Sequence, residues 1–61
     1  MIYDNVKKFC KEKEITISYL EKECGLSNGS IRKWNLCIPS VDKIQKVSTV
    51  LNVSIEDLIK D

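Results

Sequence analysis

The chain has 61 residues, of which 43% are hydrophobic and 31% charged, and its net charge is +1. This length allows a single domain over residues 1–61 with one small core, and no apolar run approaches the roughly 20 residues that a membrane-spanning helix needs. The three cysteines lack the spacing of a zinc site or an even disulfide set, and the chain has no histidine, so we expect no cofactor or metal and assign Cys10 and Cys24 to the core of a cytoplasmic protein.

Apolar residues recur at helical spacing along the whole chain, which predicts an all-α fold. The first predicted helix runs from about Asp4 to Lys13, and its apolar face consists of Ile2, Val6, Phe9 and Cys10. The second begins at Thr16, whose hydroxyl suits an N-cap, and ends at Cys24, with an apolar stripe formed by Ile17, Leu20 and Cys24.

A third helix is predicted after Ser27, ending near Asn35 or Leu36, with Ile31 and Trp34 on its apolar side. Gly25 suits the left-handed conformation that ends a helix, and Ser27 suits the cap of the next one. Two short helices joined by a three- or four-residue turn that contains glycine form the helix-turn-helix unit, which places its second helix in the DNA major groove.

Two further helices follow the break at Pro39. The fourth is capped by Ser40 and closed by Asn52, and its apolar spacing comes from Val41, Ile44, Val47, Val50 and Leu51. The fifth begins with Ser54 and Asp57, which are arranged as a capping box, and it carries Ile55, Leu58 and Ile59. We therefore expect a compact bundle of five helices.

From about Val6 to Ile59 the chain resembles the phage-repressor/Cro-type (XRE) helix-turn-helix family. The resemblance is carried by Thr16, Leu20, Gly25, Leu26, Ser27, Ile31, Trp34, Pro39, Ser40 and the ending from Leu51 to Ile59. It implies a five-helix, lambda-repressor-like DNA-binding domain.

The chain departs from the pattern of that family at four places. Glu21 stands where the family usually keeps alanine, Ile17 replaces a polar residue, Asn35 replaces a frequent glutamate, and the loop before the proline is shortened to 36–38. These changes put individual phosphate contacts in doubt, because Ile17 offers only its backbone N–H and Leu36 has no polar side chain.

The resemblance implies that the third helix reads bases through Asn28, Gly29, Arg32 and Lys33, while Ile31 and Trp34 pack into the core. Asparagine pairs with adenine, and arginine or lysine with guanine. Gly29 would permit close approach of the helix, although a loose first turn explains a glycine equally well. For Arg32 and Lys33 the alternative is a solvated helix face, with or without pairing to Glu21 or Glu23, and for Asn28 it is a local cap or turn residue.

Phosphate contacts are expected at helix N-termini, where free N–H groups attract anions. The candidates are Thr16, Ile17, Ser27, Ser30, Ser40 and Lys43. Ser30 has an alternative role in bonding its own backbone. Because the net charge is only +1, DNA binding requires basic and acidic residues to lie on different faces, and the acidic C-terminal residues Glu56, Asp57 and Asp61 are expected away from the DNA.

These features predict a sequence-specific regulator of transcription, prokaryotic or phage-encoded, that binds a pseudo-palindromic operator in double-stranded DNA as a homodimer. The dimer surface is expected among Val53, Ile55, Leu58 and Ile59 unless the core uses them. The alternative is a protein-interaction module of the antitoxin or anti-repressor type. An enzyme is not expected, because the chain has no nucleophile–base arrangement and no phosphate-binding glycine loop. No small-molecule ligand is indicated.

Overall fold

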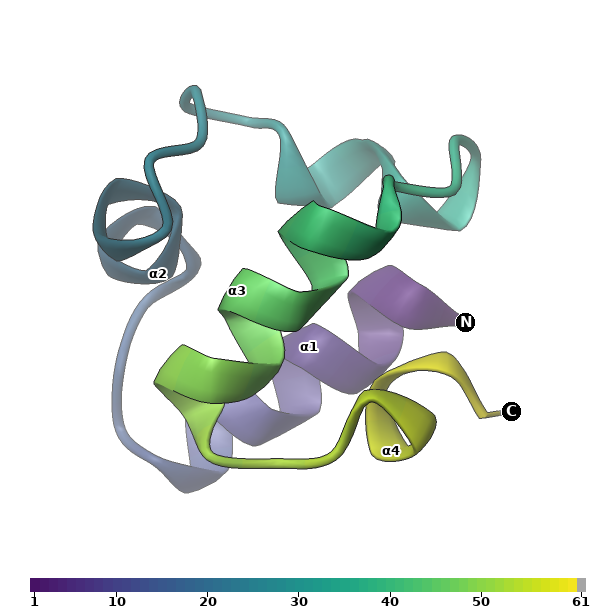
Figure 1. The fold of residues 1–61 in the computed structure, drawn as a ribbon. Helices are drawn as coiled ribbons and strands as arrows, with labels where there is room; N and C mark the ends of the chain where they lie inside the picture. The colour runs from purple at the N-terminus through teal and green to yellow at the C-terminus, as the bar shows by residue number, and fades with distance from the viewer. Residues whose placement is uncertain (61) are drawn as a thin grey trace.

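The computed structural model describes residues 1–60, and within them the regular structure is entirely helical (Figure 1). The elements in chain order are α1 (Ile2–Glu12), α2 (Ile17–Glu23), the 3-10 helix η1 (Ile31–Asn35), α3 (Val41–Leu51) and α4 (Ile55–Ile59). The predicted all-α fold is confirmed. None of these helices is long and apolar enough to cross a membrane.

The number of predicted helices needs a correction, because only four of the five helical elements described are α-helices. The third is a 3-10 helix of five residues that starts at Ile31 rather than after Ser27. Gly29 has a φ of +89°, which no α-helical residue adopts, so the segment before Ile31 forms a turn. The five residues from Ile31 to Asn35 form a short 3-10 helix, and helices of this type are seldom longer.

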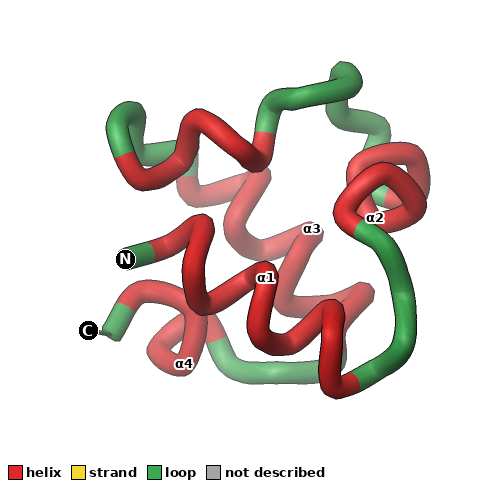
Figure 2. The backbone as a smooth tube through the Cα atoms, turned by 180° about the vertical axis from the view of Figure 1, so that it is seen from behind, coloured by secondary structure: helices red, strands yellow, loops and turns green. Residues whose placement is uncertain are grey.

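The bundle is built around α1 and α3, as the two opposite views show (Figures 1 and 2). Helix α1 contacts η1, α4 and α2, whereas α3 contacts α2 and α4. The side chains with less than 2% of their surface exposed come from all five elements and form one core: Leu20, Ile31, Leu51, Leu58, Val6 and Val47. Cys10 and Cys24 are buried in the same cluster, as predicted.

The predicted helix ends are largely confirmed. The Thr16 hydroxyl accepts a hydrogen bond from the backbone N–H of Tyr19 at 3.0 Å, and the Ser54 hydroxyl accepts one from Asp57 at 3.1 Å. Asn52 ends α3 in the left-handed conformation. Ser40 occupies the N-cap position of α3, but its side chain makes no hydrogen bond to the backbone of the helix.

Two of the valines that show the predicted helical spacing in α3 lie on the solvated side of the helix rather than in the core. Val41 is 74% exposed and Val50 is 38% exposed. The buried face of α3 instead consists of Ile44, Val47, Ser48 and Leu51. Ser48 is tolerated there because its hydroxyl donates a hydrogen bond to the carbonyl oxygen of Gln45 at 2.8 Å.

Candidate nucleic-acid interface

The turn after α2 follows from one glycine. Gly25 has a φ of +71°, and its N–H donates to the carbonyl oxygen of Lys22 at 3.2 Å. The next N–H, that of Leu26, donates to the carbonyl oxygen of Glu21 at 2.8 Å. This pair of bonds is the Schellman arrangement, which satisfies the last carbonyls of a helix and turns the chain sharply. The prediction for Gly25 is therefore confirmed.

The start of η1 is held by an acidic side chain of α2. Glu21 is 3% exposed, and both of its carboxylate oxygens accept a hydrogen bond from the backbone N–H of Gly29 at 3.1 Å. Its Oε2 also accepts one from the N–H of Ile31 at 3.0 Å. The carboxylate thus caps η1 from outside the segment, with a negative charge at the end where helix dipoles favour one.

The expected cap, Ser27, does not have this role. Its hydroxyl lies 2.7 Å from the hydroxyl of Ser30, and Ser30 itself occupies the N-cap position of η1 without a side-chain bond to the helix backbone. The prediction of a Ser27 cap is wrong because η1 begins one turn later than expected. Ser27 and Ser30 instead close the turn between them, since the Ser30 N–H donates to the Ser27 carbonyl oxygen at 3.1 Å.

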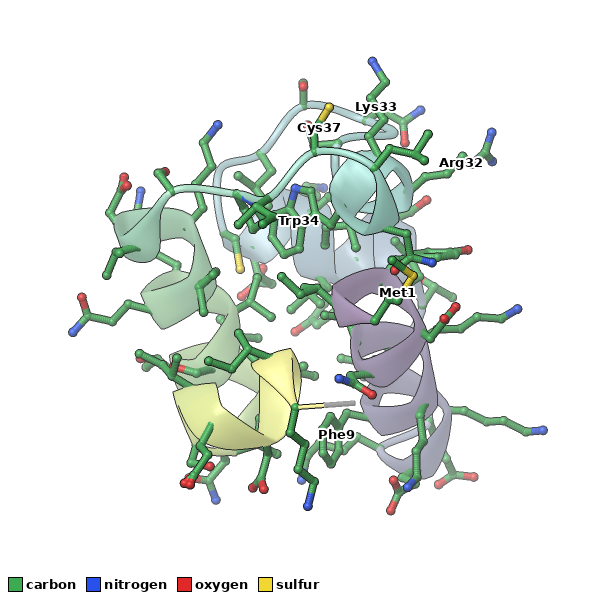
Figure 3. All side chains as sticks on the ribbon, turned by 90° about the vertical axis from the view of Figure 1, so that its right-hand side faces the viewer. Met1, Phe9, Arg32, Lys33, Trp34 and Cys37 are labelled. Carbon is green, nitrogen blue, oxygen red and sulfur yellow. The ribbon has the colours of Figure 1, made fainter. Side chains whose placement is uncertain are left out.

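The two faces of η1 separate as the sequence predicts. Ile31 is fully buried and Trp34 is 6% exposed. In Figure 3 Trp34 points into the molecule, whereas Arg32 and Lys33 point away from it. Of the four residues predicted to contact bases, Asn28, Arg32 and Lys33 are exposed. The fourth, Gly29, is half-buried.

Gly29 is required by its backbone conformation. Its φ is +89°, a backbone conformation that residues with a Cβ rarely adopt. A Cβ added at this position would meet no other part of the protein within 4 Å. This supports the interpretation of Gly29 as part of a loose first turn.

The structure brings most of the predicted contact residues into two adjoining depressions that share Asn28. One is bordered by the predicted residues Ser27, Asn28, Ser30, Lys33, Ser40 and Lys43. The other is bordered by the predicted residues Ile17, Asn28, Gly29 and Arg32. Thr16 borders neither, although it begins the helix that carries Ile17.

Charges near this surface are partly sorted. Among residues 1–60 neither Arg32 nor Lys33 forms an ion pair with Glu21 or Glu23, and both side chains are exposed to solvent. The acidic residues Glu56 and Asp57 belong to α4, which lies at the end of the molecule away from η1 (Figure 1).

Asp42 is an acidic residue at the start of α3, close to the predicted phosphate contacts Ser40 and Lys43. Asp42 follows Ser40 in the first turn of α3, and a hydrogen bond with the Ser40 side chain holds the pKa of this carboxyl below its usual range. Lys46 and Lys43 lower the pKa further. A carboxylate therefore stands beside Ser40 and Lys43, two of the predicted phosphate contacts.

Two residues that organise this surface have roles that sequence reasoning missed. Glu21 and Asn35 were both conspicuous as departures from the resembling family, but nothing in the sequence indicated what they bind. Asn35 ends η1, and its side-chain amide donates to the carboxylate of Asp4 at 3.3 Å.

Within residues 1–60 no group of three or more His, Cys, Asp or Glu side chains is placed to hold a metal ion.

A short helix, a glycine turn and a second helical segment with one buried and one basic face define a helix-turn-helix domain. The family model of the Cro/C1-type HTH DNA-binding domain matches residues 5–61. The chain belongs to that family, which confirms the resemblance and makes it a DNA-binding domain. Comparisons with curated proteins and with solved structures gave no match.

Proposed function

We propose that the chain is a sequence-specific transcriptional regulator that inserts the segment 28–33 into the major groove of double-stranded DNA. The observation that carries this proposal is the division of η1. Ile31 and Trp34 fix the segment to the core, so Arg32 and Lys33 are held outward on a rigid support. Arginine and lysine side chains bind the O6 and N7 atoms of guanine, and Asn28 is suited to adenine.

The remaining predicted contacts flank this segment on both sides. Ile17 offers a backbone N–H at the start of α2, next to Thr16. On the other side, Ser27, Ser30 and Lys43 border the same depression as Lys33. Phosphate contacts of this kind set the position of a protein on the duplex, whereas base contacts set the sequence. We therefore assign these residues and Ser40 to the DNA backbone and assign Asn28, Gly29, Arg32 and Lys33 to the bases.

We further propose that the protein acts as a homodimer, because one helix-turn-helix unit covers only half of an operator. The surface differs from the one first expected. Leu58 is buried and Val53 packs against the core, whereas Leu36 and Ile38 are 89% and 83% exposed. Together with Ile59 they border a shallow apolar depression. Leu36→Asp is expected to shift the protein toward monomer in sedimentation, and an unchanged state would exclude this surface.

Selection from a random duplex library at physiological salt tests the function directly. We expect an enriched sequence with two-fold symmetry and half-sites about 34 Å apart. The logarithm of the binding constant should fall against the logarithm of salt concentration with a slope of about −0.9 per phosphate contact. A library with no enriched sequence would refute the proposal, and an enriched but asymmetric site would refute only the homodimer.

A protein-interaction module is the second candidate function, favoured by the exposure of Leu36 and Ile38 and by the net charge of only +1. Apolar contact with a protein partner depends little on salt, whereas DNA binding weakens steeply as salt is raised. In either case we place the protein in the cytoplasm of a prokaryotic cell, either as a chromosomal or as a phage product.

A further inference from the structure

We propose that Glu21 is a positioning residue for base recognition: its carboxylate fixes the turn 28–30 and thereby sets where Asn28 and Arg32 meet the DNA. This inference rests on the proposed function. It assigns a role in recognition to Glu21 of α2, which is not among the expected DNA contacts. Glu21 does not touch the bases in this role. It acts through the backbone that carries the residues that do.

The geometry of the carboxylate supports this role. It spans eight and ten residues of sequence to bind the N–H groups of Gly29 and Ile31, at 3.1 and 3.0 Å. These two groups lie immediately before and after Ser30, at the junction between the turn and η1. Hydrogen bonds to an ionised acceptor are about twice as strong as neutral ones. Glu21 thus fixes the junction at two points.

The turn has few other restraints. Gly29 carries no side chain, and no protein atom lies within 4 Å of the position where its Cβ would be. Besides Glu21, the turn is held by the contacts between Ser27 and Ser30, which are exposed or half-buried. A glycine in an open turn has wide backbone freedom. The buried carboxylate is therefore what selects one conformation for the segment next to Arg32.

Burial of a charged group is costly unless hydrogen bonds compensate for it. Glu21 is 3% exposed, and among residues 1–60 it forms no ion pair with a lysine or arginine. Its compensation comes from the backbone N–H groups of the recognition segment. Removal of the charge therefore weakens the hold on this segment directly, because the bonds to these N–H groups lose their ionised acceptor.

Positioning and simple charge repulsion predict opposite results. Glu21 borders the same depression as Asn28, Gly29 and Arg32, so its negative charge lies close to the expected path of the DNA. If the charge only repels phosphate, its loss should tighten binding to every duplex. If Glu21 positions the turn, its loss should weaken binding to the selected site while leaving binding to random duplex unchanged or tighter. The ratio of the two affinities separates these cases.

The test compares Glu21→Gln with Glu23→Gln, which removes the same charge from an exposed position on the same helix. Dissociation constants are measured at one salt concentration for the selected duplex and for a scrambled duplex, with circular dichroism as a check of folding. We expect Glu21→Gln to lower the specific-to-scrambled ratio about tenfold, which corresponds to the loss of one good base contact. We expect Glu23→Gln to keep the ratio of the parent.

The outcomes for the parent and for Glu21→Gln separate failure of the proposed function from failure of the inference on Glu21. If the parent enriches no sequence, the proposed function and this inference both fail. If the parent is specific and Glu21→Gln keeps its ratio, only the inference on Glu21 is overturned. If Glu21→Gln does not fold, Glu21→Asp takes its place, because it keeps the charge but is too short to reach both amides; the same loss is expected, and an unchanged ratio overturns the inference.

Discussion

The side-chain oxygen of Asn35 accepts a hydrogen bond from the backbone N–H of Tyr3 at 2.9 Å, across 32 residues of sequence. The N–H groups in the first turn of a helix have no acceptor within the helix itself. Asn35, the last residue of η1, therefore supplies an acceptor for the first turn of α1 and fixes the end of η1 against that helix.

Asn35→Ala should lower the free energy of unfolding by about 1 kcal/mol, the typical value of a lost N-terminal cap. Urea denaturation measures the loss. Gln45→Ala is the matched control, because Gln45 is exposed on α3 and should change stability by less than about 0.5 kcal/mol. Equal losses in the two variants would contradict a capping role for Asn35.

Glu14→Gly should stabilise the protein. Glu14 has a φ of +58° just after α1, a conformation that costs a residue with a Cβ about 1–2 kcal/mol. Glycine avoids this cost but loses about 0.5–1 kcal/mol of its own through greater freedom in the unfolded chain, so we expect a net gain of about 0.5–1 kcal/mol. Glu12→Gly, at the last residue of α1, should instead destabilise by up to about 1 kcal/mol. Thermal unfolding of both variants shows whether the signs differ.

Trp34→Ala should lower the free energy of unfolding by about 3–5 kcal/mol, because this side chain is 6% exposed in the core. For a domain of this size, such a loss leaves little or no folded protein. Far-ultraviolet circular dichroism checks the outcome, and a folded variant with the stability of the parent would mean that Trp34 does not contribute to the core.

Arg32→Ala and Lys33→Ala should each cost about 1–3 kcal/mol of discrimination at one base pair. Both side chains are exposed, so the stability of the fold should not change. Binding assays with single base-pair changes in the selected duplex locate the affected position. Lys8→Ala, on the exposed face of α1, serves as the control. If neither recognition variant differs from the parent, these side chains do not read bases.

Stability should fall at alkaline pH because of the two buried thiols. Burial raises the pKa of the Cys10 and Cys24 thiols above their ordinary value of 9.0. A folded-state pKa that is higher than the unfolded one gives stability that is complete below the unfolded pKa and is lost as pH rises through the folded pKa. The free energy of unfolding should therefore decline above about pH 9, and less steeply in Cys10→Ala. Identical slopes in the two proteins would contradict this.

The sequence predicts the features of the fold that depend on residues close together in the chain. Gly25 ends α2 and Thr16 caps it through residues one turn away, and the spacing of Ile31 and Trp34 separates the two faces of η1. It does not reveal that η1 is a 3-10 helix, because five residues are too few to distinguish a repeat of 3.0 from one of 3.6. The partners of Glu21 and Asn35 were also out of reach, since they lie 8 to 32 residues away and depend on the assembled fold.

The side-chain amide of Asn5 donates hydrogen bonds to the carbonyl oxygens of Leu58 and Lys60, at 2.7 and 2.6 Å. Helix α4 has only five residues, and a helix this short does not persist alone in water. During synthesis, which proceeds from the N-terminus, the side chain of Asn5 therefore gains these hydrogen bonds only when the end of α4 has been made. The core around Val6 gains Leu58 at the same stage. Because η1 packs against α1 and α1 packs against α4, we expect a chain that lacks α4 to hold the segment 28–33 less firmly and to select DNA sequences poorly.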